Sequence, residues 1–436
     1  MLWRTLDSMN RTIKMIVGGA LALVVLVWTV HDSFRQHQVI DTDDWKTELR
    51  ADAAGYYIYL PGVIHHGMRP GWLSDERLRI IGSGIQEDTA RNIIRTKYTY
   101  GTALIELPFF LAAELIVGWG NSDGFTPVHH RAMDVAGIVL WWSGLLLLWS
   151  ALRRKWPVPG SIGLALLFLM SQGTNVFYYA FRSPAYSHIG SWVLVCLALW
   201  CWAHGVSGRD GRWRGALFRI ACAWLILIRP LDLLLVLALY ALVLADEPFT
   251  RRPRWFLGQI VIGIALALPQ MFYWQAAYGD PIVFSYQNEG FTNWRTPHLL
   301  ATYLAPKNGL LPYAPAFLLL PVAVLAAWHR ERTRTIIVLF MFLLYWYAVS
   351  SWWDPAFGCS FGQRSFVQTV PLLAMITWCA VHHWWPRRPA IVLLLLAPFL
   401  AAAFINNMLA HLYDMCYWST TWDPTQWLGN IRQVFN

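Results

Sequence analysis

Long apolar blocks separated by short charged loops restrict the fold of this chain more than any other feature. The blocks recur between residues 13 and 413, and at roughly 15 to 22 residues each is long enough to cross a hydrocarbon layer about 30 Å thick. Only 14% of the 436 residues are charged and 57% are apolar, so the charged share is about half that of a soluble domain. The pattern predicts an all-α polytopic membrane protein and excludes a water-soluble fold.

The net charge of +9 comes from short basic clusters between the apolar blocks. Short loops rich in Lys and Arg stay on the cytoplasmic side of a membrane, so these clusters predict orientation, and no nucleic-acid partner is expected. The clusters predicted to be cytoplasmic begin at Arg4, Arg153, Arg209, Arg251, Arg330 and Arg387. The first block is followed by a polar segment without a small-residue cleavage site, so we expect it to remain as a span.

The block at residues 101–119 conflicts with this orientation, because a full crossing there would place the cluster at Arg153 outside. It contains Glu106 and Glu114, and a carboxylate at the centre of a bilayer costs about 3 kcal/mol unless it is paired. We therefore expect this block to lie along the outer interface or to re-enter the membrane. Eleven spans then remain, at residues 13–30, 130–152, 161–179, 187–204, 215–229, 231–245, 256–277, 309–328, 335–350, 366–385 and 390–411.

These spans predict a single transmembrane domain over residues 1–436 in a plasma membrane. The N-terminus is cytoplasmic, residues 31–128 form a long extracytoplasmic loop with interfacial helices, and residues 414–436 form a short extracytoplasmic tail. Nearly all unusual polar motifs fall on the extracytoplasmic side. We therefore expect the active site to be extracytoplasmic.

The sequence shows no strong cofactor or metal motif. Its six cysteines include no Cys-x-x-Cys pair, so neither a zinc site nor a redox motif is expected. Cys359 and Cys416 fall outside the spans on the oxidising side, which leaves a disulfide between them open. Three acidic residues in the first outer loop form either a solvated turn or a site for a divalent ion: Asp41, Asp43 and Asp44.

The first motif of chemical interest is ADAAGYYIYLPGVIHHG at residues 51–67. Tyr56, Tyr57 and Ile64 have the spacing of a short amphipathic helix at the interface. Asp52 stands at the start of this helix. Its carboxylate is either a helix cap or a catalytic base or metal ligand.

Three further motifs supply cations on the outer side. Lys97, just before the block at 101–119, is either a snorkelling anchor or a phosphate ligand. Arg229 lies between two apolar blocks and needs an anionic partner, which is either Asp232 or an anionic ligand. Arg364 follows the glycine-rich segment FGCSFGQ, and a planar guanidinium can hold a phosphate bidentately.

The outer loop at residues 279–308 places aromatic rings beside hydrogen-bonding groups. Its residues include Tyr286, Glu289, Trp294 and Lys307. Such a mixture suits a sugar, although aromatic residues are also common at membrane interfaces. His188, between the third and fourth spans, either has its hydrogen bonds satisfied locally or contacts the substrate.

The order of these motifs resembles that of the GT-C type integral membrane glycosyltransferases, in particular the bacterial branch related to the protein mannosyltransferases and the aminoarabinose transferase. The resemblance covers nearly the whole chain. It rests on an acidic residue followed by GYYIYLP, then KYTYG, GTN, SH, RP, YGDP with SYQNEGF, PKNGLLPYAP, and WW with FGCSFGQRSF. It implies a GT-C fold of about 11 transmembrane helices, with interfacial helices in a long first extracytoplasmic loop.

The resemblance also implies a reaction and its residues. Asp52 takes the catalytic role toward the acceptor, and the phosphate of a polyprenyl-phosphate sugar is held by Lys97, Arg229, Lys307 and Arg364. Apart from the resemblance, we expect contacts to the sugar or the acceptor from Tyr56, Tyr57, His188, Tyr286, Glu289 and Trp294. The implied reaction is an inverting transfer of the sugar to a hydroxyl of a lipid-linked glycan, a lipid or a protein, with membrane lipids as surroundings.

Two other classes of protein share this composition. A lipid-linked sugar transporter needs access from both faces, whereas the polar motifs gather on one side and no inverted repeat is evident. An O-antigen polymerase or ligase has a similar number of spans, but its large outer loop usually comes late in the chain, whereas the loop here follows the first span. The sequence leaves the sugar, the acceptor, metal dependence and the oligomeric state open.

Overall fold

The computed structural model describes residues 11–37, 49–208, 211–247, 253–287, 289–358 and 360–413. About 72% of the structure is helical, which confirms the prediction of a polytopic helical membrane protein. Within the described residues, six segments are long and apolar enough to cross a membrane. They correspond to α7 (Pro127–Lys155), α10 (Ser187–His204), α13 (Pro253–Tyr278), α17 (Arg332–Ser350), α18 (Val370–Trp384) and α19 (Pro389–Leu412).

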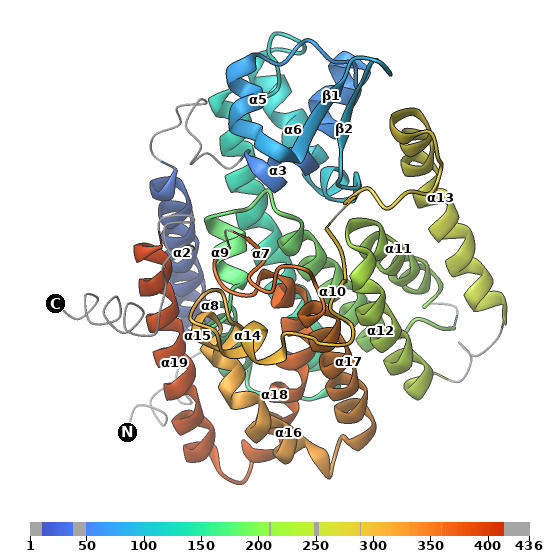
Figure 1. The fold of residues 1–436 in the computed structure, drawn as a ribbon. Helices are drawn as coiled ribbons and strands as arrows, with labels where there is room; N and C mark the ends of the chain where they lie inside the picture. The colour runs from blue at the N-terminus through green and yellow to red at the C-terminus, as the bar shows by residue number, and fades with distance from the viewer. Residues whose placement is uncertain are drawn as a thin grey trace.

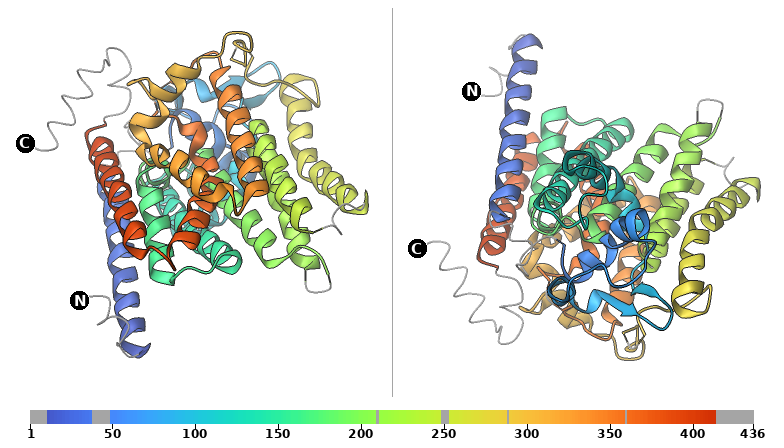
Figure 2. Two further views of the ribbon diagram at one scale, coloured as in Figure 1. Left: turned by 90° about the horizontal axis from the view of Figure 1, so that it is seen from below. Right: turned by 90° about the horizontal axis from the view of Figure 1, so that it is seen from above.

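Other helices occupy the remaining predicted spans, and the total of eleven stays a prediction. These helices are α2 (Arg11–Gln36), α8 (Gly160–Gln172), α9 (Val176–Phe181), α11 (Arg212–Ile228), α12 (Leu233–Asp246) and α16 (Leu320–Trp328). Helices α2 and α19 lie at one edge of the bundle and α13 at the opposite edge (Figures 1 and 2). In the apolar stretch that contains α18, 94% of the residues are buried inside the protein, whereas in that of α13 only 11% are buried. Helix α18 therefore lies at the centre of the bundle.

Two predicted spans are interrupted. The span expected at 161–179 breaks between α8 and α9, and the span expected at 309–328 begins as α15 (Leu310–Tyr313) and η5 (Pro315–Leu319) before α16. The two breaks meet, because the backbone N–H of Ala316 donates to the carbonyl of Gly173 at 3.1 Å. The side chain of Asn406 donates to the carbonyls of Gln172 and Thr174 at 3.1 and 3.0 Å. These bonds satisfy backbone groups that a lipid environment cannot.

An outer layer formed by residues 49–126 covers one end of the bundle (Figure 1). It contains an antiparallel hairpin of β1 (Ile85–Asp88) and β2 (Ile93–Thr96), in which Ile85 pairs with Thr96 and Asp88 with Ile93. This small hairpin departs from the all-α expectation. The other elements of the layer are α3 (Ala51–Tyr57), α4 (Tyr59–Pro61), η1 (Gly62–His66), α5 (Asp75–Ile81), η2 (Gly82–Gly84) and α6 (Gly101–Val117).

The helical run from α3 to η1 was expected to be an amphipathic interfacial helix, and the structure buries most of it instead. Tyr56, Tyr57 and Tyr59 are each less than 7% exposed. The hydroxyl of Tyr57 donates to the carbonyl of Gly124 at 2.6 Å, and that of Tyr59 donates to the carbonyl of Tyr98 at 2.7 Å. Because the phenol hydroxyls find backbone acceptors, the aromatic residues can be buried on all sides of the helix.

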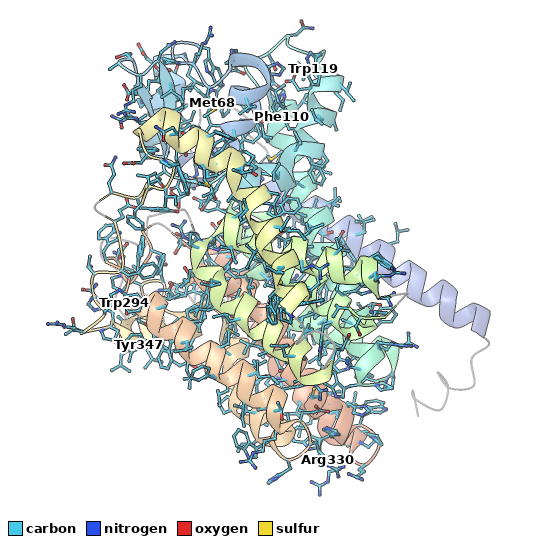
Figure 3. All side chains as sticks on the ribbon, turned by 90° about the vertical axis from the view of Figure 1, so that its right-hand side faces the viewer. Met68, Phe110, Trp119, Trp294, Arg330 and Tyr347 are labelled. Atoms are coloured by element: carbon cyan, nitrogen blue, oxygen red, sulfur yellow. The ribbon has the colours of Figure 1, made fainter. Side chains whose placement is uncertain are left out.

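The predicted cytoplasmic ends of several helices meet on the face opposite the outer layer. Lys155 Nζ, at the end of α7, lies 2.7 Å from Asp246 Oδ2, at the end of α12. Arg334 Nη2, at the start of α17, lies 2.6 Å from the other oxygen of Asp246. Figure 3 shows Arg330 at this end and Trp119 of the outer layer far from it. The clusters at Arg153 and Arg330 therefore share one face of the molecule.

Candidate active site

A cavity of about 390 Å³ is lined by residues of both the outer layer and the helix bundle. Its lining comes from α3, the segment after β2, the start of α10, the turn between α11 and η3 (Pro230–Asp232), α13, and the loops at 279–298 and 351–364. Most of the residues singled out in the sequence meet here although they are far apart in the chain. Those that line the cavity are Asp52, Tyr56, Lys97, His188, Arg229, Tyr286, Glu289 and Arg364.

Three other candidates lie away from this cavity. Tyr57 is fully buried in the outer layer, and Lys307 is exposed. Trp294 is 49% exposed and stacks on Tyr347 with ring centroids 6.0 Å apart (Figure 3). Asp41, Asp43, Asp44, Cys359 and Cys416 lie outside the described residues. Within the described part of the chain, no group of three or more His, Cys, Asp or Glu side chains could hold a metal ion.

The cavity also contains residues that were not predicted to belong to the site. They are mainly Tyr98, Tyr186, Trp352, Asp354 and Phe357. Tyr98 belongs to the motif KYTYG and Asp354 to the segment WWDP. The sequence reveals these motifs, but it does not reveal that the two side chains face the cavity. In a non-helical segment no period fixes that direction, and only the packed loops define it.

Asp52 is the second residue of α3 and faces the cavity. Its Oδ2 lies 2.8 Å from Nη2 of Arg364, and the hydroxyl of Tyr98 donates to its Oδ1. The N-cap of α3 is Arg50, and in the described part of the chain no side-chain hydrogen bond caps the helix. The carboxylate is therefore used toward the cavity and not as a helix cap.

The charge state of Asp52 follows from these neighbours. Burial raises the pKa of this carboxyl, but Arg364, the hydroxyl of Tyr98 and Lys97 together lower it below its ordinary value. Positive charge and donated hydrogen bonds both favour the ionised form. Asp52 is thus a carboxylate at neutral pH and can accept a proton.

Lys97 forms an ion pair across the cavity. Its Nζ lies 2.9 and 2.8 Å from the two carboxylate oxygens of Glu289 and 5.4 Å from the ring centroid of Tyr286. The hydroxyl of Ser285 also donates to the carbonyl of Lys97 at 2.5 Å. These contacts fasten the loop at 279–298 to the end of β2, and Glu289 balances the charge of Lys97.

Arg229 differs from the other two cations of the cavity. Its Nη1 lies 2.5 Å from Nδ1 of His188, and its Nη2 donates to the hydroxyl of Ser365 at 3.2 Å. Asp232, the partner considered from the sequence, is buried and accepts hydrogen bonds from Ser191 and Gln368 at 2.7 and 3.0 Å. Among the described residues, Arg229 therefore forms no ion pair with a carboxylate, although the charge of Asp232 acts on it electrostatically.

The walls between these charges are apolar and aromatic. They include Ile228, Leu231, Trp274, Phe284, Phe291, Trp352 and Phe357. Such walls can contact a lipid chain or the apolar face of a sugar ring. The chemistry available to the cavity is thus proton acceptance by Asp52 and anion binding by Arg229, beside a surface for an apolar group.

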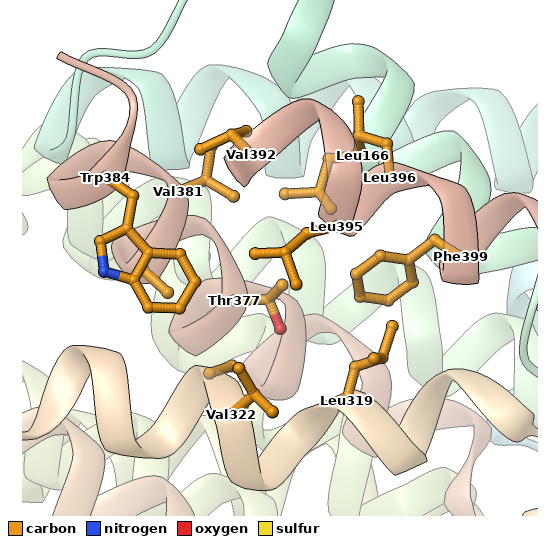
Figure 4. A pocket seen from close by; sticks show the side chains of 12 residues that line it. Leu166, Leu319, Val322, Thr377, Val381, Trp384, Val392, Leu395, Leu396 and Phe399 are labelled. Carbon is orange, nitrogen blue, oxygen red and sulfur yellow. The ribbon is translucent and has the colours of Figure 1, made fainter. Parts of the chain in front are cut away.

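A second hollow, between α8, α16, α18 and α19, offers no such chemistry (Figure 4). None of the described residues that line it is charged, and the hydroxyl of its Thr377 already donates to the carbonyl of Leu373 at 3.1 Å. The larger cavity is therefore the candidate functional site.

Comparison with known proteins shows which folds this chain is similar to. No protein-family model and no curated protein sequence matches the chain. The chain is similar to the crystal structure of ArnT from Cupriavidus metallidurans in the apo state, with a TM-score of 0.51 and 16% identity over 92% of this chain. It spans 66% of the length of ArnT.

The archaeal oligosaccharyltransferase AglB from Archaeoglobus fulgidus also matches. That protein was solved in complex with an inhibitory peptide and a dolichol-phosphate. The TM-score is 0.49 with 11% identity, and the match covers 95% of this chain and 60% of AglB.

Proposed function

We propose that this chain, which has the GT-C membrane fold, is a glycosyltransferase that moves a sugar from a polyprenyl-phosphate donor to an acceptor hydroxyl on the extracytoplasmic face. One observation carries the proposal: an ionised carboxylate, Asp52, and a guanidinium without a carboxylate partner, Arg229, line the same cavity. A transferase of this kind needs a base for the acceptor and a cation for the leaving group within one site. The likeness in fold to ArnT, an aminoarabinose transferase, supports the class of reaction.

In the proposed reaction, Asp52 accepts the proton of the acceptor hydroxyl as the oxygen attacks the anomeric carbon of the donor. The new carbon–oxygen bond forms while the bond between that carbon and the phosphate oxygen breaks. The electron pair of the broken bond leaves with the lipid phosphate. Because the attack is direct, the configuration at the anomeric carbon is inverted.

Arg229 is the proposed site for the departing phosphate. Its guanidinium is fixed by His188 and Ser365, so its charge is in place before negative charge develops on the leaving group. Lys97 adds positive charge on another wall of the cavity, although Glu289 neutralises part of it. Ile228, Leu231 and Trp274 offer an apolar surface near Arg229 for the first units of the lipid chain.

The location of the cavity accounts for the choice of donor. The cavity adjoins the outer layer, on the face opposite the basic clusters at Arg153 and Arg330. Under the positive-inside rule, the basic face is cytoplasmic and the cavity is extracytoplasmic. Soluble nucleotide sugars are absent on that side, so a lipid-linked sugar is the donor we propose, in a bacterial inner membrane.

The proposal is tested by incubating the purified protein with a panel of polyprenyl-phosphate sugars and lipid acceptors, and following each donor by mass spectrometry. We expect loss of one donor with formation of a glycosylated acceptor, and no loss with the Asp52→Asn variant. Consumption of diphosphate-linked glycans alone would indicate a polymerase or ligase instead. Movement of a labelled lipid across a vesicle membrane without sugar transfer would indicate a transporter.

A further inference from the structure

We infer that Arg364 is a positioning residue for Asp52 and not a ligand of the donor phosphate. The inference rests on the proposed function and divides the work between the two arginines of the cavity. Arg364 holds the base, and Arg229 holds the phosphate. The family resemblance implies instead that both arginines hold the phosphate.

The contacts of Arg364 leave little of its charge for a second anion. Its Nη2 lies 2.8 Å from Asp52 Oδ2, and its guanidinium carbon lies 5.4 Å from the ring centroid of Tyr186. A phosphate bound by Arg364 would have to displace Asp52 or lie beside it. Displacement would leave the partly buried carboxylate of Asp52 without its cation, and binding beside it would bring two anions together. Both arrangements cost free energy. Arg229 forms no ion pair with a carboxylate among the described residues. Asp232 acts on it only electrostatically, and the oxygens of Asp232 already accept hydrogen bonds from Ser191 and Gln368.

The loop before Arg364 is tightly packed, so the backbone that carries this side chain is held in place. Gly362 has φ +65°, and a Cβ there would lie 2.3 Å from Cβ of Tyr313 and 2.8 Å from Nδ2 of Asn175. Asn175 in turn donates to the carbonyl of Phe361 at 2.9 Å. The motifs GTN and PYAP, which have no role in the proposed reaction itself, thus hold the segment that carries Arg364.

The second contact of Asp52 is fixed in the same way from the opposite side. A Cβ at Gly55 would lie 2.4 Å from the ring of Tyr98, so the absence of a side chain lets Tyr98 pack on α3. The hydroxyl of Thr96 donates to the carbonyl of Gly55 at 2.8 Å, which joins β2 to α3. Tyr98 and Arg364 therefore bind the two oxygens of Asp52 from separate, packed segments, as a base that must meet its acceptor in one geometry requires.

Arg364 also determines whether the base is ionised. Among the described residues, the charged or titratable groups that interact with Asp52 are Arg364, Lys97, Tyr98, Tyr56, Tyr186 and Tyr286. Burial raises the pKa of Asp52, and Arg364 makes the largest opposing contribution. Removing that cation raises the pKa of Asp52, so the carboxyl becomes protonated at a higher pH than in the parent protein.

The test compares Arg364→Gln, Arg364→Lys and Arg229→Gln in the full-length purified protein. Binding of a short-chain polyprenyl phosphate and single-turnover sugar transfer are measured from pH 4 to 8. We expect both Arg364 variants to bind the lipid within about twofold of the parent, and Arg229→Gln to bind at least ~10-fold more weakly, which corresponds to about 1.4 kcal/mol. Transfer by Arg364→Gln should fall ~10²-fold, and its loss of activity in acid should begin at a higher pH.

The lysine variant separates charge from geometry. It keeps the cation and loses the planar fork, so we expect reduced transfer. The acid limb of its pH profile, which is the range where activity is lost as the pH falls, should lie closer to that of the parent protein. Arg229→Gln should leave the acid limb unchanged. If either Arg364 variant lost lipid binding as strongly as Arg229→Gln, or if the acid limb of Arg364→Gln did not move, Arg364 would not be a positioning residue. Arg364→Lys decides the question if Arg364→Gln fails to fold, and failure of the parent protein to bind the lipid would overturn the proposed function itself.

Discussion

Asp52→Asn separates a catalytic base from a structural carboxylate at the scale of single residues. Asparagine has the same size and still accepts hydrogen bonds, but it does not take up a proton at neutral pH. We expect transfer to fall by ~10²–10⁴-fold for loss of general-base catalysis. Binding of polyprenyl phosphate should be retained, because the proposed phosphate site at Arg229 is separate from Asp52.

Single-turnover transfer and lipid binding, measured on the same Asp52→Asn preparation, check this expectation. The control for structure is the unfolding temperature of the variant in detergent, which should equal that of the parent protein. Near-normal transfer would assign the base to another carboxylate and would also remove the basis for a positioning role of Arg364.

Gly55→Ala tests the packing that holds Tyr98 against Asp52. The added Cβ would lie 2.4 Å from the ring of Tyr98, so the ring must move, at a cost of about 1–3 kcal/mol for overpacking. The hydrogen bond from Tyr98 to Asp52 is then weakened. We expect slower transfer and an acid limb displaced to higher pH, with unchanged lipid binding. Gly263→Ala in α13, where a Cβ meets nothing within 4 Å, is the matched control, and equal rates in the two variants would contradict the prediction.

The pairing of charges shows the limit of sequence reasoning at this scale. Motifs identified most of the cavity residues, but not which cation meets which carboxylate. Asp232 lies three residues from Arg229, yet its oxygens are satisfied by Ser191 and Gln368. Lys97 instead meets Glu289, far along the chain. Ion pairs at a cavity are fixed by how segments pack, and separation along the sequence carries little of that information.

Among the elements, helix α6 buries polar residues and exposes apolar ones, which is the reverse of a helix at a water-facing surface. Thr102, Glu106 and Glu114 are at most 2% exposed, whereas Leu115 and Ile116 are more than 70% exposed. His65 and His129 each place Nε2 2.9 Å from the carboxylate of Glu114. An apolar outward face with buried polar residues is what a helix in contact with lipid shows. This polarity supports the expectation that residues 101–119 lie along the outer interface.

A spin label at position 115 measures the surroundings of α6 directly. In a variant with Cys359 and Cys416 replaced by serine, we expect a label at Leu115→Cys to be more accessible to oxygen than to a water-soluble nickel chelate. A label at Glu76→Cys, on the exposed face of α5, is the matched control and should show the reverse. Equal access to the nickel chelate at both sites would place α6 in water and remove the interfacial assignment.

The elements themselves were predictable to different degrees. Hydropathy located every long helix, because the length of an apolar block follows from the thickness of the membrane. Hydropathy did not locate the break after Gln172, because the bonds from Asn406 and Ala316 that permit it come from distant spans. The hairpin of β1 and β2 was also missed. Its turn depends on Asn92 at φ 53° and on the Asp88 carboxylate, which accepts the N–H of Arg91 at 3.0 Å.

The whole molecule has two chemically different ends. One end gathers basic residues, where Asp246 joins α7 to α17 through Lys155 and Arg334. The other carries the outer layer and the cavity with Asp52. The sequence anticipated this division from loop charges alone, because orientation depends on local charge. The depth and shape of the cavity depend on contacts between distant segments and could not be anticipated in that way.

The orientation of these two ends in the membrane is tested by labelling cysteines in intact cells. Arg154→Cys lies on the basic face and Arg295→Cys in the outer loop, and both native positions are exposed. With an impermeant thiol reagent, and with Cys359 and Cys416 replaced by serine, we expect labelling at position 295 alone. After permeabilisation both positions should react, which controls for accessibility. Labelling at 154 but not at 295 in intact cells would reverse the topology, place Asp52 in the cytoplasm beside soluble nucleotide sugars, and remove the physical reason for a lipid-linked donor.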